Sequence, residues 1–297
     1  MLHPGEYAVQ RRTGLADGSR GSVAVGADVP PVAAEFLAGR RLTVIAAVDD
    51  AGTPWIGPVT GPPGFLAAPD ARTVVVDRLP GAGDPLAGLF DAEREVGMLV
   101  IDPPTRRRMR VNGRARREGG GLVVRTEQVY SNCPKHLQVR TFRDSPPLER
   151  KVAPVTTALT VAQQHWIAAA DTFFVGTYAE GLGVDASHRG GNPGFVRVLD
   201  EGRLAWPDYV GNTMFMTLGN LELEPRCALA FLDWETGDVV QLTGRARVDG
   251  DAGRAATFPG AQRVIDFEIG GVVETVGGLG QRWTFGEYSR FNPPITS

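Results

Sequence analysis

Short apolar runs rich in β-branched residues alternate along this chain with Gly, Pro and Asp turns, which is typical of antiparallel β-structure. The run Leu42–Val48 (LTVIAAV) predicts a buried strand that is closed by the turn at 49–52. Three consecutive glycines at 119–121 predict a hairpin turn between two longer strands. The other strands predicted in the first half are 65–68, 73–76, 96–102, 107–117 and 121–129.

The second half repeats this order of elements. Its predicted strands are 173–178, 195–199, 203–206, 228–233, 239–248 and 263–274, with an insertion near 249–261. Short helices are predicted at 31–37, 85–90, 135–140 and 161–170. Short strands that are separated by turns, with few helices, predict a small closed barrel in each half.

Two sequence motifs show that the halves are copies of one another. Gly-Pro-Pro-Gly-Phe at 61–65 returns as Gly-Asn-Pro-Gly-Phe at 191–195. Asn-Gly-Arg-Ala-Arg at 112–116 returns as Thr-Gly-Arg-Ala-Arg at 243–247, so both motifs recur after nearly the same distance along the chain. An offset that stays nearly constant between separate motifs indicates one domain that was duplicated and fused.

The repeat sets the expected organisation of the chain. It predicts a mainly β protein of two tandem β-barrels with short helices, in which the tail is an ordered coil packed on a barrel. The expected segments are an N-terminal arm (1–40), copy one (41–131), a linker with helices (132–164), copy two (165–276) and a C-terminal tail (277–297).

Composition excludes several classes of function. The 297 residues carry a net charge of −3, so no overall positive field favours nucleic acid or an anionic membrane. The sequence has neither a signal-peptide pattern at its start nor an apolar run that could span a bilayer. Two cysteines make no disulfide framework, which suits a reducing compartment, and we expect a cytoplasmic protein. No His, Cys, Asp and Glu group has metal-ligand spacing, so no metal site is expected.

The first difference between the copies lies at 187–191. Copy two has Ser187, His188, Arg189, Gly190 and Gly191 where copy one has the apolar 57–61. A fixed cation, neutral donors and glycines that let the backbone come close are what a phosphate needs. The pattern predicts an anion-binding loop in copy two alone. The alternative is a solvated turn whose arginine faces water.

The second difference lies at 206–213 (WPDYVGNT), which faces 76–83 (VDRLPGAG) in copy one. We expect Asn212 and Thr213 to begin a helix, where free backbone N–H groups favour an anion. Trp206 and Tyr209 are expected to line a flat ligand. The alternative for Trp206 is a place in the core, which is the commoner fate of a strand tryptophan.

The third difference is an arginine-rich segment of copy one at 105–110 (TRRRMR), which faces 236–241 (TGDVVQ) in copy two. One reading is charged protection of a strand edge. The other is that the barrels face each other about a pseudo-twofold axis. In that case arginines such as Arg106 and Arg108 would reach a ligand held by copy two.

These segments resemble a known family. Residues 187–196, 207–212 and 130–138 are similar to motifs of the flavin-binding split-barrel family related to pyridoxamine 5′-phosphate oxidase. His-Pro-Gly-Glu at 3–6, with Gln10, resembles the long, duplicated branch of that family. The resemblance extends over about residues 2–293. It implies split β-barrels that pair and hold FMN, or FAD, at their interface. Together with the repeat, it implies an intrachain pseudo-dimer.

The resemblance also implies site residues. It places the flavin phosphate near Ser187, Arg189 and Arg197, then Asn212 and Thr213, and it places Gln241 near the ring. Backbone groups at 207–209 would approach the isoalloxazine, and copy one or the linker would form the far wall. The full candidate set is Ser187, His188, Arg189, Gly190, Phe195, Val196, Arg197, Pro207, Asp208, Tyr209, Asn212, Thr213, Gln241, Arg106, Arg108, Asn132 and Lys135.

The expected function is a flavin-dependent oxidoreductase acting on a small organic substrate, with NAD(P)H or oxygen as electron partner. His188 is the catalytic candidate, as a proton donor. The alternatives are a flavin carrier, a haem-binding barrel, and an interaction module that has lost its cofactor. The tail lacks the Arg and His segment that grips pyridoxal phosphate in the true oxidase, which argues against vitamin B6 oxidation. One flavin per chain is expected, and a homodimer is left open.

Overall fold

The computed structural model describes residues 3–14, 25–131, 134–146, 148–211 and 213–295. Two antiparallel sheets dominate it. The strands of copy one are β1 (Leu42–Val48), β2 (Pro54–Thr60), β3 (Leu66–Asp70), β4 (Thr73–Val76), β5 (Arg94–Asp102), β6 (Arg107–Glu118) and β7 (Gly121–Ser131). Those of copy two are β10 (Thr172–Ala179), β11 (Gly183–Gly190), β12 (Arg197–Asp200), β13 (Arg203–Tyr209), β14 (Arg226–Leu232), β15 (Val239–Asp249) and β16 (Ala261–Val276).

The two sheets have the same topology. The order is β2-β1-β5-β6-β7-β4-β3 in copy one and β11-β10-β14-β15-β16-β13-β12 in copy two. Register agrees as well, since Val44 pairs with Leu99 and Phe174 pairs with Ala230. The predicted fold class, mainly β with two tandem split barrels, is therefore confirmed.

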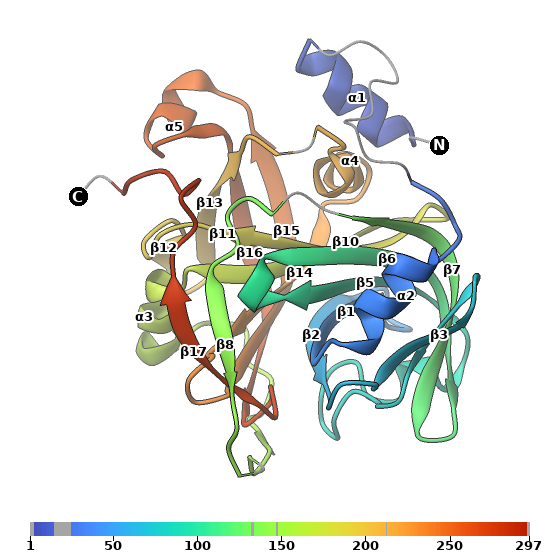
Figure 1. Cartoon of the computed structure of the whole chain (residues 1–297). Coiled ribbons are helices and arrows are strands. Elements are labelled where there is room, and N and C mark those ends of the chain that lie inside the picture. Colours follow the sequence, from blue (N-terminus) through green and yellow to red (C-terminus); the bar gives the residue numbers. More distant parts are fainter. Residues whose placement is uncertain (1–2, 15–24, 132–133, 147, 212, 296–297) are drawn as a thin grey trace.

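The remaining elements surround the sheets (Figure 1). Strands β8 (Val139–Arg143) and β17 (Arg282–Glu287) form a separate two-stranded ribbon, and β9 (Lys151–Val152) pairs with the end of β16. The helices are α1 (Pro4–Arg12), α2 (Pro31–Ala38), α3 (Val161–Ala169), α4 (Met216–Leu223) and α5 (Ala252–Ala256), with 3-10 turns η1 (Leu89–Asp91) and η2 (Pro103–Thr105). Helix α1 packs on α4 at one end of the molecule.

Central strands serve two cores at once. Along β1, Ile45 and Ala47 face the interior of copy one, whereas Val44 and Ala46 pack in a third cluster that includes Phe174 of copy two. This follows from the two-residue period of a strand. The third cluster joins the copies into an intrachain pseudo-dimer.

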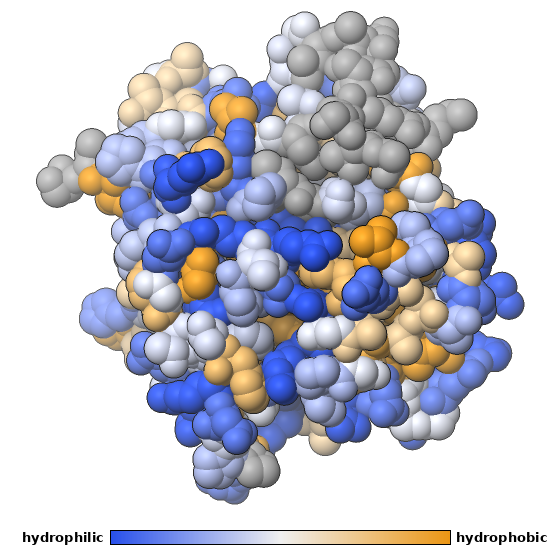
Figure 2. Space-filling view, viewed as in Figure 1, coloured by the Kyte–Doolittle hydropathy of each residue, from blue (hydrophilic) through white to orange (hydrophobic). Residues whose placement is uncertain are grey.

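Glycine lets the copies approach closely. A Cβ on Gly97 of β5 would lie 2.7 Å from backbone atoms of Asp185 in β11. On the face seen in Figure 2, hydrophobic residues form small separate patches among hydrophilic ones, as expected when the apolar surface lies inside and between the barrels. Within the described residues, no helix has the length and apolarity needed to cross a membrane.

Several predicted elements are wrong. The segments 57–61 and 187–191 are not loops, because they lie largely in β2 and β11. Both are the outer strands of their sheets, where proline and glycine are tolerated, so their strand signal is weak in the sequence.

The linker and the tail also differ from expectation. The predicted helix at 135–140 is a turn followed by β8, and the tail contains β17 rather than only coil. The two strands of this ribbon come from distant parts of the chain, as in the pair Trp283 and Phe142, so neither has a local signal. Helix α1 was not expected, and the predicted helix at 85–90 is reduced to turns and η1.

Candidate functional site

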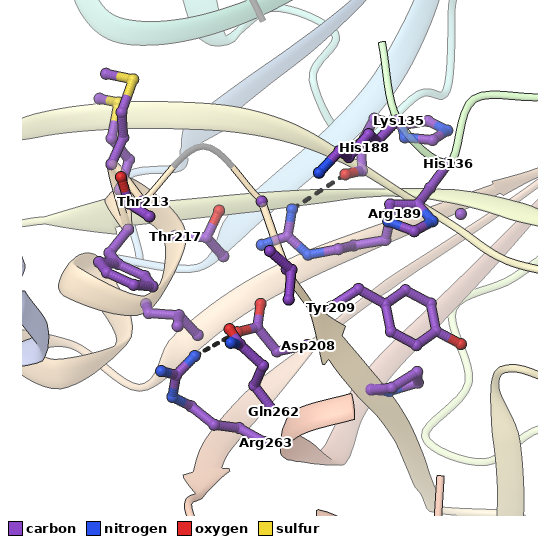
Figure 3. Close-up of a pocket in the computed structure, with 18 of the residues that line it drawn as sticks. Lys135, His136, His188, Arg189, Asp208, Tyr209, Thr213, Thr217, Gln262 and Arg263 are labelled. Atoms are coloured by element: carbon purple, nitrogen blue, oxygen red, sulfur yellow. Dashed lines mark hydrogen bonds and ion pairs between the residues drawn. The ribbon is translucent and has the colours of Figure 1, made fainter. Parts of the chain in front are cut away.

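A pocket of about 250 Å³ opens between the two copies (Figure 3). Lys135, His136, His188 and Arg189 gather on one side of it, and Thr213 and Thr217 lie on the other. Its lining comprises Thr13, Leu99, Arg108, Arg110, Lys135, His136, His188, Arg189, Gly190, Phe195, Pro207, Asp208, Tyr209, Val210, Gly211, Thr213, Met214, Phe215, Met216, Thr217, Leu218, Gln262 and Arg263. Both copies and the linker therefore contribute to one site.

Arg189, near the end of β11, is a cation that forms few hydrogen bonds with the described part of the protein. Its Nη1 donates to the carbonyl of His188 at 3.0 Å, and it makes no ion pair with any residue that the structure describes. Burial lowers the pKa of Arg189, against the opposing effect of the Asp208 carboxylate, but a guanidinium stays charged in proteins. A partly buried cation of this kind favours an anionic ligand.

His188 adds a neutral donor beside that cation. Burial, and then the charges of Arg108 and Arg189, hold the pKa of His188 well below its ordinary value, so the ring is neutral. Its Nδ1 lies 2.7 Å from Nη1 of Arg108 and accepts that hydrogen bond. The hydrogen is then on Nε2, which is buried and has no acceptor among the described residues. His188 lines the pocket, so this N–H is a donor candidate for a ligand.

His136 lies against Tyr209, with 5.0 Å between the ring centroids. Burial lowers the pKa of His136 to about 4, and Arg108, Lys135 and Arg189 act in the same direction. A side-chain hydrogen bond with Asn292 opposes this shift, and Nδ1 of His136 has no partner among the described residues. The cationic side of the pocket thus contains two uncharged imidazoles.

These imidazoles predict a pH dependence of stability. Between about pH 6.5 and 4 the unfolded chain binds a proton at His136 that the native chain excludes, so the free energy of unfolding falls as the pH falls through this window. Chemical denaturation at several pH values measures that slope. We expect the His136→Gln variant to have a shallower slope than the parent protein. An identical slope in both proteins would contradict this assignment.

The opposite wall is apolar and strained. Met214, Phe215 and Leu218 supply it, at the start of α4. Thr213 and Phe215 have φ values of 60° and 57°, and His136 across the pocket has 64°. Three of the four non-glycine residues with positive φ in the described chain therefore line this pocket. Backbone strain of this kind, about 1–3 kcal/mol per residue, concentrates at functional sites.

A buried ion pair closes the lower side of the pocket. Nη1 of Arg263 donates to Oδ2 of Asp208 at 2.7 Å. Burial raises the pKa of Asp208, while Arg189 and Arg263 oppose that rise. Asp208 is thus hydrogen-bonded to Arg263 and also interacts electrostatically with Arg189.

A polar network underlies the floor. Arg110 of β6 donates to Oδ1 of Asp185 at 3.0 Å and to the hydroxyl of Tyr130 at 2.9 Å, and it also bonds to Ser187. Ser187 donates to Asp185 at 3.0 Å and lies 2.9 Å from the hydroxyl of Thr217. Ser187 is fully buried, so it supports the pocket from beneath and is not part of its wall.

The structure brings most of the candidate residues together. His188, Arg189, Gly190, Phe195, Pro207, Asp208, Tyr209, Thr213, Arg108 and Lys135 all line the pocket. The helix expected at Asn212 and Thr213 begins later, at Met216, and Asn132 and Asn212 lie outside the described residues. Trp206 is in the core of copy two, where its ring meets Phe173 edge-on.

Four candidate residues lie elsewhere. Val196 is in the core of copy two, because it packs inside the barrel. The guanidinium of Arg197 lies 3.7 Å from the ring centroid of Phe258 and bonds to Thr257, beside α5. Arg106 donates to the carbonyl of Leu137 at 2.9 Å and pairs with Glu287 of the ribbon.

Gln241 is the fourth, and its position is informative. It occupies in copy two the place that Arg110 has in copy one, since Ala230 pairs with Gln241 and Leu99 pairs with Arg110. Its Nε2 donates to the carbonyl of Ile56 at 3.0 Å and lies 3.3 Å from Oδ1 of Asp84. Gln241 therefore belongs to the pseudo-symmetric counterpart of the pocket.

That counterpart is filled with protein. Arg150 pairs with Asp84 at 3.1 Å and also donates to the carbonyls of Ala82 and Gly278. A Cβ on Gly57, the counterpart of Ser187, would lie 2.6 Å from Nε2 of Gln241. Within the described residues, this packing leaves no equivalent of the first pocket at the counterpart position in copy one.

Some lining residues were not expected. His136 lies within the linker motif and Arg110 within the arginine-rich segment, so a sequence signal existed for both. Arg263 and Phe215 had none. Arg263 reaches the site only because β16 pairs with β13. Phe215 reaches it because the backbone turns just before α4.

Known proteins resemble this chain only over part of its length. No protein-family model and no curated protein sequence matches the chain. Most of the matching solved structures span about two fifths of it.

One match is a protein of the pyridoxinephosphate oxidase family from Clostridium acetobutylicum, related to general stress protein 26 of B. subtilis, at 11% identity and a TM-score of 0.29, covering 42% of this chain and 92% of that one. A FAD-binding protein from Mesorhizobium loti matches at 14% identity and a TM-score of 0.30, covering 41% and 96%. HupZ of group A Streptococcus matches at 13% identity and a TM-score of 0.31, covering 37% and 90%. None of these TM-scores reaches 0.5.

Proposed function

We propose that this protein is a flavin-dependent oxidoreductase that holds one FMN between its two copies. The observation that carries the proposal is the pair formed by Arg189 and His188 on β11. One is a partly buried cation without an ion-pair partner in the described chain, and the other is a neutral donor whose Nε2 has no acceptor among the described residues. A phosphate group meets both needs at once.

The rest of the pocket suits a flat ring. The backbone at 207–209, the ring of Tyr209 and the apolar side chains of Met214, Phe215 and Leu218 form its walls. Arg108 contributes positive charge from copy one, which favours a reduced, anionic ring. A flavin, when bound, supplies hydride and electron transfer, and the protein supplies position and charge.

The size of the pocket favours FMN over FAD. At about 250 Å³ it lies just below the usual range for ligand pockets, about 300–1,000 Å³, so the smaller of the two flavins is favoured. FAD would have to extend its adenosine beyond the walls described above. Competition between FMN and FAD for the purified protein tests this preference, and stronger binding of FAD would reverse it.

An absorption spectrum tests the proposal. The purified protein, mixed with FMN and then freed of excess ligand, is expected to retain the two visible bands of an oxidised flavin. A Soret band in the purified protein would instead support a haem-binding barrel. Absence of any chromophore after addition of FMN would overturn the flavin assignment.

A second experiment separates an enzyme from a flavin carrier. The FMN-loaded protein is mixed with NADH or NADPH without oxygen, and oxygen is then admitted. An oxidoreductase is expected to lose its visible flavin bands with at least one donor and to recover them with oxygen or a small organic acceptor. Bands that persist with both donors would favour a carrier.

A further inference from the structure

A second cavity, of about 170 Å³, lies on copy two at the C-terminal end of α3. Three of the chain's five tryptophans line it, namely Trp166, Trp234 and Trp283. Phe285 adds a fourth aromatic ring from β17. Such a gathering of aromatic rings in a small cavity is typical of a binding site. We call it the tryptophan cavity.

The tryptophan cavity carries excess negative charge. The one cation among its lining residues, Arg140, is paired with Asp171 at 2.6 Å and lies 4.7 Å from the ring centroid of Trp234. Two further carboxylates line the wall, Asp233 and Glu235, and neither makes an ion pair within the described residues. Positively charged ligands are therefore favoured here.

Two polar atoms of the lining residues have no hydrogen-bond partner in the described part of the chain. Oγ1 of Thr172 and Nε1 of Trp283 are buried without a hydrogen-bond partner, and both residues are at most 3% exposed. A hydroxyl oxygen can accept from an N–H donor. Thr172 is a lining residue whose hydroxyl oxygen has no partner among the described residues.

Copy one shows what occupies the matching position there. The N–H of Arg40 donates to the carbonyl of Leu37 at 2.9 Å, and in copy two the N–H of Ala170 donates to that of Ile167 at 3.2 Å. These two hydrogen bonds are separated along the chain by the same offset as the repeated motifs, so Arg40 corresponds to Ala170. The guanidinium of Arg40 lies 4.6 Å from the ring centroid of Phe36.

Arg40 is held there by a carboxylate. Its guanidinium pairs with Asp102 at the end of β5, where copy two has Asp233 at the end of β14. Phe36 corresponds in the same way to Trp166. In copy one, then, a guanidinium of the chain itself fills the space between an aromatic ring and a carboxylate.

Copy two keeps an aromatic ring, Trp166, and a carboxylate, Asp233, but has no arginine at the position of Arg40. Alanine stands at 170 in place of Arg40, and Asp171 stands in place of Arg41. Arg107, which also lies over Phe36 at 5.0 Å, is replaced by Asp238. The aromatic ring has changed to tryptophan, the side chain that attracts cations best.

We propose that the tryptophan cavity binds the guanidinium group of a ligand in the place that Arg40 takes in copy one. The group stacks on Trp166 and pairs with Asp233. Its planar N–H donors suit a carboxylate and an aromatic face together. The volume of the cavity fits one such group, carried by a small molecule or by an arginine side chain. This site does not depend on the flavin pocket.

The test follows the five indole N–H signals by NMR while L-arginine amide is added to the full-length protein. We expect the signals of Trp166, Trp234 and Trp283 to shift, with a dissociation constant on the order of 1 mM. The signals of Trp55 and Trp206, which lie in the two barrel cores, are expected to stay in place. Urea, the neutral analogue of guanidinium, should give no shift.

A matched pair of variants sharpens the test. Ala170→Arg places a guanidinium where copy one has Arg40, so L-arginine amide should no longer shift the three signals. His165→Arg adds the same charge at an exposed position of α3, and binding should persist. If Ala170→Arg does not fold, Asp233→Asn should still weaken binding several-fold.

The remaining outcomes are decisive. Equal shifts with urea, no shifts with L-arginine amide, or retained binding in Ala170→Arg would each overturn the proposal. A pentapeptide, Gly-Gly-Arg-Gly-Gly, distinguishes the two sources of the guanidinium. Tighter binding of this peptide than of L-arginine amide indicates an arginine of a protein partner, and weaker binding indicates a small free ligand.

Discussion

Replacing Arg189 by alanine is expected to raise the dissociation constant for FMN by roughly 10- to 100-fold. Hydrogen bonds to a charged group contribute about 1.5–3 kcal/mol, and each 1.4 kcal/mol is about a factor of ten. Arg189 is partly buried and makes no ion pair within the described chain, so its charge is available to a phosphate. Quenching of FMN fluorescence on titration with protein measures the change.

Two variants, Arg197→Ala and Thr60→Ala, serve as controls for Arg189→Ala. Arg197 follows Arg189 closely in the sequence, but its guanidinium lies over Phe258, so Arg197→Ala should leave FMN binding nearly unchanged. Thr60→Ala alters the position in copy one that matches Gly190 and should also leave it unchanged. Equal losses in Arg189→Ala and Arg197→Ala would show that the phosphate lies elsewhere.

Replacing Arg110 by methionine is expected to destabilise the fold by about 3–5 kcal/mol, the cost of leaving one member of a buried ion pair without its partner. Asp185, at 1% exposure, would lose the guanidinium that lies 3.0 Å away. The pair joins β6 of copy one to β11 of copy two, so the loss falls on the contact between the copies. Urea denaturation followed by tryptophan fluorescence measures it.

The matched control is Gln241→Met, at the equivalent position of copy two. Gln241 is neutral and donates to one carbonyl at 3.0 Å, so we expect a loss of about 1 kcal/mol. Arg110→Met combined with Asp185→Asn should recover part of the stability, because no buried charge is then left alone. If the two single variants lost equal stability, the ion pair would not have the role assigned to it.

The sequence alone could predict most of the fold, because the strand patterns and motifs of copy one occur again in copy two. Strand β1 has the predicted bounds, and the two motifs at a constant offset correspond to sheets of identical order. Strands β2 and β11 were missed because proline and glycine hide an outer strand. Strands β8 and β17 were missed because each pairs with a segment far away in the chain.

The site was partly predictable for a related reason. The copies differ in sequence at His188 and Arg189, as expected if only copy two holds the ligand at this position. The resemblance to the flavin-binding split-barrel family placed Arg197 with them, yet β11 and β12 stand at opposite ends of the strand order. Arg263 and Phe215 depend on strand register and on a left-handed turn, which no local pattern reveals.

The number of FMN molecules bound per chain tests whether the chain has a single flavin site between its two copies. Arg189 and His188 leave an anion site open in one pocket, whereas Arg150, Asp84 and Gln241 fill its counterpart. Titration of the flavin-free protein with FMN, followed by fluorescence to a sharp end point, is expected to give one equivalent per chain. An end point at two equivalents, or no binding at all, would contradict this account.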